Sequence, residues 1–268
     1  MTPGLRRSSA AVAVVAVLSL AMQVAAQTSK SSEQTYNPPR LRNGEPDFRG
    51  IWQARTIVDW GIEGHPAEKG VAASKSIIVD PPGGRIPYQP WALAKSQENF
   101  KSRKTEDPQT NCFQAGVPRA TYLPSPLQIV QSPGRLAIVY QDAHTYRVIY
   151  MDGRPHYDRV DWWMGDSRGR WEENTLVVSV KDLNDQTWFD KAGNFHSEEM
   201  HVLERYTLTG PDTLQYEATM QDPKVFTKAW TLRLDLFRHK EPGFRIVEDE
   251  CEEDAQGVRR HVRTPAPR

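Results

Sequence analysis

The sequence contains few of the features that identify a protein class at once. It has two cysteines among 268 residues, and two thiols cannot supply the ligand set of a structural cysteine-based zinc site. Its formal net charge is zero, so neither nucleic acid nor an anionic membrane is an expected partner. It has no Gly-x-Ser-x-Gly elbow, no P-loop and no dinucleotide fingerprint. The predicted partner is therefore a small-molecule ligand or substrate.

The chain also lacks an apolar run of about 20 residues, which a membrane-spanning helix requires. Its longest apolar stretch extends from Ala10 to Met22, follows two arginines and precedes small residues that end at Ala26. This order is typical of a secretory signal peptide. We therefore expect residues 1–26 to be removed near Ala26, which leaves a periplasmic or extracellular protein without an integral membrane segment. An uncleaved membrane anchor is the alternative.

In an exported protein, two cysteines suggest one disulfide bond. A bond between Cys112 and Cys251 would close a long loop, and the chain-entropy model makes such closure worth about 4–5 kcal/mol. Two buried free thiols are the alternative interpretation.

The N-terminal half reads as irregular structure. The chain contains 20 prolines and has a low mean hydropathy, which indicates one β-rich domain with extensions. We expect a flexible tail over 27–49. An irregular segment over 50–126 should follow and pack on the domain through one short helix. That helix should begin near Pro90, because proline suits a first helical position and good helix formers follow it.

From Leu127 the sequence becomes a series of short apolar segments that are separated by turn residues. The segments are LQIVQS, RLAIVYQD, TYRVIYM, TLVVSVKDL, MHVLERYTL, TLQYEATMQ, AWTLRLDLF and FRIVEDEC. Several alternate between apolar and polar residues, as half-buried strands do. This pattern predicts a mainly β fold, a single antiparallel β-barrel of roughly lipocalin-like form over 127–254, with a flexible tail over 255–268. A β-sandwich is the alternative.

The stretch GNFHSEEMHVLERY is the densest group of titratable residues. His196 and His201 are five residues apart, so they diverge on a helix and lie on opposite faces of a strand. Glu204 falls on the apolar face of the predicted strand, beside Val202 and Tyr206. Such a carboxylate is either half of a buried ion pair or an acid–base group whose pKa is raised by burial.

Polar and aromatic residues also collect at the predicted strand ends, where binding residues are common. These candidates for substrate binding are Tyr146, Arg154, His156, Trp163, Trp188 and Asp190. Aromatic rings above a polar pocket suit sugars or phenolic compounds.

Two functions of different class fit these residues. The first is an enzyme that acts on a small sugar-like or phenolic ligand by hydrolysis or elimination. In it, His196 or His201 is the general base, Glu204 is the acid, and Arg205, with Arg154, stabilises negative charge. The second is a lipocalin-like protein that binds a small ligand without catalysis. No cofactor is predicted. A weaker alternative is a divalent metal held by His156, His196, His201 and Glu198.

Several longer motifs are similar to those of an uncharacterised group of secreted bacterial proteins that is frequent in soil bacteria. They include GEPDFRGIWQ, CFQAGVPR, TYRVIYMDGRPH, GRWEENTLVVSV and GNFHSEEMHVLERY. The resemblance covers nearly all of the chain after the predicted signal peptide, and both cysteines match the group's pattern. It implies export and supports the disulfide, and it implies no particular reaction.

Overall fold

The computed structural model describes residues 1, 36–67, 71–157, 160–253 and 259–263. The chain divides into two units, 1–35 and 36–268, and all helices and strands described below belong to the second. The predicted signal peptide and the first part of the predicted tail over 27–49 fall within 2–35, outside the described residues.

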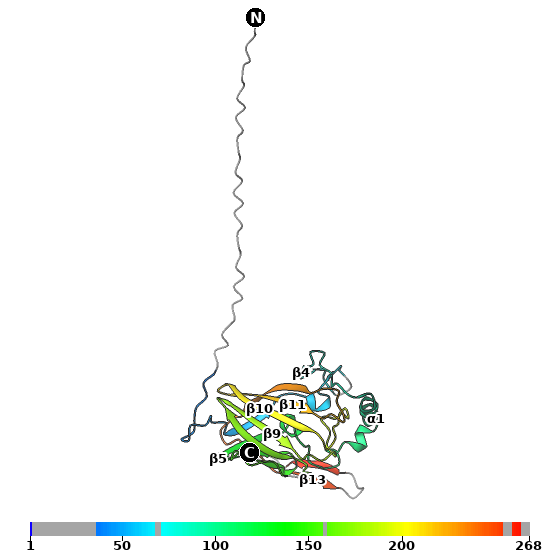
Figure 1. Ribbon diagram of the computed structural model, residues 1–268. Coiled ribbons are helices and arrows are strands. Elements are labelled where there is room, and N and C mark those ends of the chain that lie inside the picture. Colours follow the sequence, from blue (N-terminus) through cyan, green and yellow to red (C-terminus); the bar gives the residue numbers. More distant parts are fainter. Residues whose placement is uncertain (2–35, 68–70, 158–159, 254–258, 264–268) are drawn as a thin grey trace. The chain divides into compact units, whose positions relative to one another are not determined.

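Nine of the described strands close into a β-barrel. In order around the barrel they are β1 (Gly50–Ala54), β5 (Leu127–Ser132), β6 (Arg135–Tyr140), β7 (Tyr146–Tyr150), β8 (Asp166–Glu172), β9 (Thr175–Lys181), β10 (His201–Gly210), β11 (Thr213–Gln221) and β12 (Trp230–Arg238). The barrel closes because β1 pairs with β5 on one side and with β12 on the other. Figure 1 shows β9, β10 and β11 side by side in its wall. The prediction of a mainly β, single-barrel fold is confirmed, and the sandwich alternative is wrong.

One seam of the barrel departs from the antiparallel prediction. Strands β7 and β8 run parallel, with Ile149 opposite Ser167 and Tyr150 opposite Arg168. Two parallel strands cannot be joined by a tight hairpin, so the chain needs a crossover. Residues 151–165 form this connection, which we call the crossover segment, and they contain no named helix or strand among the described residues.

The barrel also begins earlier in the chain than predicted. Strand β1 precedes residue 127, and β4 (Ile78–Asp80) pairs with the first part of β12. The predicted lower boundary at 127 is therefore wrong. Both strands are very short, so the sequence shows too little alternation to identify them as part of the sheet. Between them lie a 3-10 turn, η1 (Val58–Trp60), and the small pair β2 (Gly64–His65) and β3 (Ser74–Lys75).

The predicted helix is present as α1 (Pro90–Glu106), with proline at its first turn. Its buried residues are Ala92, Ser96 and Asn99, which share one face because they follow helical spacing. Shorter helical turns are α2 (Arg119–Tyr122) and η2 (Asp142–His144). None of the described helices is both long and apolar enough to cross a membrane.

The C-terminal part forms a separate hairpin. Strands β13 (Asp249–Glu253) and β14 (Arg259–Arg263) pair with each other and not with the barrel sheet. The predicted tail over 255–268 is thus partly strand, while 254–258 and 264–268 lie outside the described residues. The predicted disulfide is confirmed: Cys112 and Cys251 are bonded, with their Cα atoms 5.7 Å apart. It ties the hairpin to the segment after α1.

The barrel interior contains the residues that the alternation predicts. On β9 the buried residues include Leu176, Val178 and Val180, and β11 and β12 contribute similar rows, which are Leu214, Tyr216, Ala218 and Met220, and Trp230, Leu232 and Leu236. Because side chains alternate along a strand, Ser179 lies on the outer surface of the barrel.

Candidate functional site

Polar side chains converge on the outer surface of β8, β9 and β10. Arg168 of β8 is directly opposite Ser179 of β9, and Ser179 is directly opposite Leu203 of β10. Asp166 and His201 lie two residues from Arg168 and Leu203, so they share this outer surface. The crossover segment then places His156 among them.

Three hydrogen bonds link these groups in a line. Nδ1 of His156 is 2.9 Å from Oδ2 of Asp166, and Nε2 of His156 is 2.9 Å from Oγ of Ser179. Oγ of Ser179 is also 2.9 Å from Nε2 of His201. We call Asp166, His156, Ser179 and His201 the Ser179 cluster.

The positions of the protons in the Ser179 cluster follow from the donors available. A carboxylate only accepts, so His156 donates its Nδ1–H to Asp166, and in the neutral form of the ring Nε2 is then an acceptor. The single hydroxyl proton of Ser179 then points to His156, and His201 donates its Nε2–H to Ser179. Burial, aided by the nearby Lys181, lowers the pKa of His201, which favours this neutral imidazole.

The backbone and a neighbouring arginine fix His156 in place. The His156 side chain is 18% exposed. Arg168 donates from Nε to the carbonyl of Pro155 at 2.9 Å and pairs through Nη1 with Oδ1 of Asp166 at 2.7 Å. The crossover segment returns to β8 at Gly165, which has φ +64°, and a Cβ there would lie 2.6 Å from a Val180 side-chain atom. Only glycine allows this close approach.

Two hollows adjoin the Ser179 cluster. The first, which we call the arginine hollow, has a volume of about 520 Å³ and is lined by Asp152, Arg154, Pro155, His156, Tyr157 and Arg168. The second, which we call the aromatic pocket, has a volume of about 740 Å³, and its lining includes Tyr146, Tyr150, Tyr157, Trp162, Trp163 and Asp166. Tyr157 lines both hollows, so they are neighbours.

The structure therefore gathers four of the predicted substrate-binding residues around one site: Tyr146, Arg154, His156 and Trp163. Tyr146 is 68% exposed. Trp163 is held by a stacked contact with Phe113, with ring centroids 4.9 Å apart. A ligand ring entering the aromatic pocket would therefore meet at least one aromatic side chain, Trp163, that is held in place by a neighbour.

The other predicted residues lie elsewhere. Trp188, His196 and Glu198 line a separate groove of about 720 Å³ beside α1. His196 is buried, bonds to Oγ1 of Thr187 at 2.7 Å and to the carbonyl of Ser197 at 2.9 Å, and burial lowers its pKa. Glu198 is exposed and pairs with Lys224 at 2.6 Å.

Glu204 lies inside the barrel and is fully buried. Its two carboxylate oxygens accept from the guanidinium of Arg147 at 2.7 and 2.9 Å. The hydroxyl groups of Tyr206 and Tyr216 donate to Oε1 at 3.0 and 2.8 Å. The structure thus shows the buried ion pair that was one of the two interpretations of this residue.

Arg205 and Asp190 are also bound within the fold. Arg205 pairs with Glu172 at 2.9 Å on the outer surface. Asp190 is buried and accepts from the backbone N–H groups of Ile62, Ala192 and Asn194 and from the side chain of Asn194. Burial raises the pKa of Asp190 to about 7.

The predicted catalytic set of His196, His201, Glu204 and Arg205 is therefore not gathered. His196 lines the groove beside α1, Glu204 lies inside the barrel, and His201 and Arg205 lie on the outer surface of β10. The convergence of His156, His196 and Glu204 that this catalytic assignment requires is not found in the structure.

The weaker metal alternative is likewise dispersed between the Ser179 cluster and the groove beside α1. Among the described residues, a different set has metal-ligand proximity: one atom from each of His156, Asp166 and Asp182 lies within 4.8 Å of the others. These three residues could hold a cation. The Asp166 carboxylate is already paired with Arg168, so a cation would have to compete with that guanidinium.

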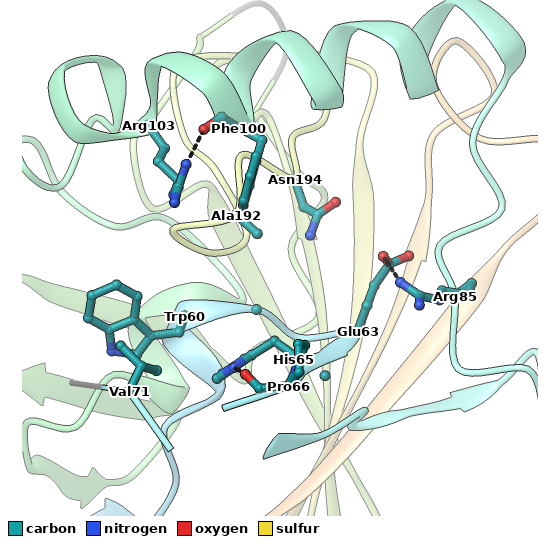
Figure 2. Close-up of a pocket in the computed structure, with 12 residues that line it drawn as sticks. Trp60, Glu63, His65, Pro66, Val71, Arg85, Phe100, Arg103, Ala192 and Asn194 are labelled. Atoms are coloured by element: carbon teal, nitrogen blue, oxygen red, sulfur yellow. Dashed lines mark hydrogen bonds and ion pairs between the residues drawn. The ribbon is translucent and has the colours of Figure 1, made fainter. Parts of the chain in front are cut away.

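A further cavity of about 290 Å³ lies beneath α1 and involves none of the predicted site residues (Figure 2). Arg85 is turned toward Glu63 and pairs with it at 3.0 Å, and Arg103 donates to the carbonyl of Phe100 at 2.7 Å. Both arginines that line this cavity are therefore bound to groups of the protein itself.

Sequence reasoning missed Asp166, Arg168 and Ser179. Ser179 is an ordinary outward residue of the predicted strand TLVVSVKDL, and Asp166 and Arg168 lie in a stretch for which the sequence predicts no strand, although it forms β8. Their significance depends on His156, which the crossover segment brings over β8 and β9. A scan against family models and a search among curated proteins each returned no match for this chain.

Proposed function

We propose that the protein is an exported hydrolase that cleaves a small aromatic or phenolic ester at the Ser179 cluster. The observation that carries the proposal is the line of hydrogen bonds from Asp166 through His156 to Ser179, each 2.9 Å long. A hydroxyl bonded to an imidazole, which is oriented in turn by a carboxylate, is the arrangement of serine nucleophiles. The disulfide fits an oxidising, extracytoplasmic compartment.

Each residue has a chemical role in this proposal. His156 takes the hydroxyl proton at Nε2 while Oγ of Ser179 attacks the ester carbonyl carbon. Asp166 holds the Nδ1–H, which fixes the tautomer and stabilises the imidazolium. His201, which donates to Ser179, keeps the hydroxyl proton directed at His156. His156 replaces His196 and Glu204 as the acid–base group.

The aromatic pocket supports the substrate class. Its rings include Tyr146, Trp162 and Trp163, and flat rings stack against aromatic faces with a preference beyond burial alone. Asp166 lines this pocket and also binds His156, so a ligand ring there lies beside the Ser179 cluster. This favours a phenolic compound over a sugar.

The test measures release of 4-nitrophenolate from 4-nitrophenyl acetate and 4-nitrophenyl benzoate. Ser179→Ala and His156→Ala should lower kcat/KM by about 10²–10⁴-fold, the usual contribution of acid–base catalysis. Ser132→Ala, which alters an exposed serine on β5, should leave it unchanged. Wild-type rates in Ser179→Ala would overturn the proposal.

A second candidate is ligand binding without catalysis. Two observations favour it. Ser179 does not line the aromatic pocket, and its hydroxyl is already bonded to two imidazoles, those of His156 and His201. Quenching of tryptophan fluorescence by 4-nitrophenol tests it. Binding that is lost in Trp163→Ala and kept in Ser179→Ala, with no ester cleavage by the wild type, would favour this candidate.

A further inference from the structure

Three aromatic side chains line the groove beside α1 in one connected row. They are Trp91, Phe195 and Trp188. The ring centroids of Trp91 and Phe195 are 6.1 Å apart, and Phe195 pairs with Trp188 in an antiparallel bridge, which places those two side chains on the same face. Phe195 is also stacked on Tyr88, with centroids 5.9 Å apart. Trp91 is 52% exposed, so the row is open to a ligand that enters the groove.

One face of α1 forms a wall of this groove. The α1 residues that line it recur every three or four positions, which places them on a shared helix face, and they include Trp91, Lys95, Glu98, Ser102 and Glu106. Trp91 and Glu106 are 15 positions apart, which corresponds to about 22 Å along the helix axis. A groove of this length accommodates several linked rings rather than a single ring.

The lining of the groove carries more carboxylates than ammonium groups. The charged residues are Glu98, Glu106, Asp185 and Glu198, against Lys95 and Lys224. Glu98 pairs with Lys95 at 3.2 Å, and Glu198 pairs with Lys224 at 2.6 Å. Glu106 and Asp185 form no ion pair with any residue that the structure describes. The excess of negative charge would repel an anionic ligand.

A chain of sugar rings matches both the aromatic and the charged groups of the groove. A hydroxyl group both donates and accepts, so the carboxylates can accept its proton and the lysines can donate to its oxygen, in bonds that charge strengthens. The C–H groups on one face of a sugar ring carry partial positive charge and pack against the negative face of an aromatic ring. A compact cation would satisfy the carboxylates but would be repelled by the two lysines. The groups present therefore favour a neutral polyhydroxy ligand.

We propose that the groove beside α1 binds a neutral oligosaccharide. In this site Trp91 and Trp188 pack against sugar rings, and the carboxylates of Glu106 and Asp185 accept from sugar hydroxyl groups. The site is separate from the Ser179 cluster, because the groove shares no lining residue with the aromatic pocket or the arginine hollow. The inference therefore does not depend on the proposed hydrolase function. His196 takes no part in ligand hydrogen bonding, because both of its ring nitrogens are bonded within the fold.

The test measures binding of tetrasaccharides by isothermal titration calorimetry and by tryptophan fluorescence. The neutral probes are cellotetraose, xylotetraose, mannotetraose and maltotetraose, the anionic probe is tetragalacturonic acid, and the cationic probe is the glucosamine tetramer. At least one neutral probe should bind with a Kd below about 1 mM. Trp91→Ala, Trp188→Ala and Asp185→Ala should each weaken that binding by about tenfold. The matched control is Trp60→Ala, which removes a tryptophan of similar exposure, 46%, from the cavity beneath α1 and should leave the affinity unchanged.

Several results would overturn the proposal. The site is not a saccharide site if no neutral probe binds at about 10 mM, or if either charged probe binds more tightly than every neutral one. Wild-type affinity in both Trp91→Ala and Asp185→Ala would place the saccharide elsewhere, and loss of binding in Ser179→Ala would place it at the Ser179 cluster. Should Trp188→Ala not fold, Trp91→Ala decides alone, because Trp91 lies on the exposed side of α1. Failure of ester cleavage leaves this inference intact.

Discussion

The ion pair between Arg147 and Glu204 offers the sharpest test of how the barrel interior is held together. Both side chains are almost completely buried, at 2% and 0% exposure. Arg147→Met would leave the Glu204 carboxylate without its counterion in the core. Removing one partner of a buried pair costs about 3–5 kcal/mol, because the other charge is left uncompensated. For a domain of this size the thermal midpoint should fall by roughly 2–4 °C for each kcal/mol.

The double variant separates the charge from the other contacts of the pair. Glu204→Gln keeps an oxygen that accepts from Tyr206 and Tyr216, and by itself leaves the Arg147 cation unpaired. We expect this single variant to cost about as much as Arg147→Met. Combined, the two substitutions remove both charges together, so the total loss should be at least about 3 kcal/mol smaller than the sum of the single losses.

Equilibrium unfolding in urea, followed by tryptophan fluorescence and circular dichroism, measures all three variants. The matched control is Arg233→Met, which breaks a cross-strand pair with Glu217 at 2.6 Å on the outer surface, where the side chains are 47% and 23% exposed. A pair of this kind is worth about 0–1 kcal/mol. The reasoning is refuted if Arg147→Met costs no more than the control, or if the losses of the two interior variants simply add.

Three further predictions concern the rest of the fold. Replacing Cys112 and Cys251 by serine should lower the free energy of unfolding by up to about 5 kcal/mol, because the bond spans 139 residues; an unchanged urea midpoint would contradict this. Burial raises the folded-state pKa of Asp190 to about 7 from an ordinary value of 3.8, so its contribution to stability is complete below about pH 4 and lost as the pH rises through 7. The loss amounts to at most about 4 kcal/mol, and unfolding curves of Asp190→Asn across this range should lack that slope. Gly193→Ala should destabilise more than Gly134→Ala in thermal unfolding, by about 1–3 kcal/mol. Both glycines have a positive φ, but a Cβ at Gly193 would lie 2.6 Å from a side-chain atom of α1, whereas one at Gly134 meets nothing within 4 Å.

Strand alternation predicted most of the barrel because it is a local property of the chain. The rows on β9, β11 and β12 follow directly from it, and so does the anomaly at Glu204. Its partner was also readable, since Arg147 interrupts an apolar strand face beside Ile149. What could not be read locally was pairing between distant segments. Strand β1 has only five residues, and its role in closing the barrel depends on two partners far along the chain.

The sequence also does not show which distant segments meet in space, and this is why the candidate site was only partly predicted. The sequence assigns His156 and His196 to one site, as a substrate-binding residue and a catalytic base, yet one lies over β9 and the other lines a groove beside α1. Their separation follows from the paths of two long connections, 151–165 and 182–200. Neither path is determined by residue periodicity. Only the relative position of whole strands decides which side chains of those connections meet.

The parallel pairing of β7 and β8 is related to the odd number of strands in the barrel. Strand direction must return to itself after one circuit of a closed barrel, so the number of antiparallel neighbours around it has to be even. Nine strands have nine neighbouring pairs, and the eight antiparallel pairs here therefore require one parallel pair. Because β7 and β8 are also consecutive in the chain, they require a long connection that leaves the sheet and returns to it. The segment that delivers His156 to Ser179 thus results from the odd number of strands together with the place of the parallel pair, and a barrel of eight alternating strands would have no need of it.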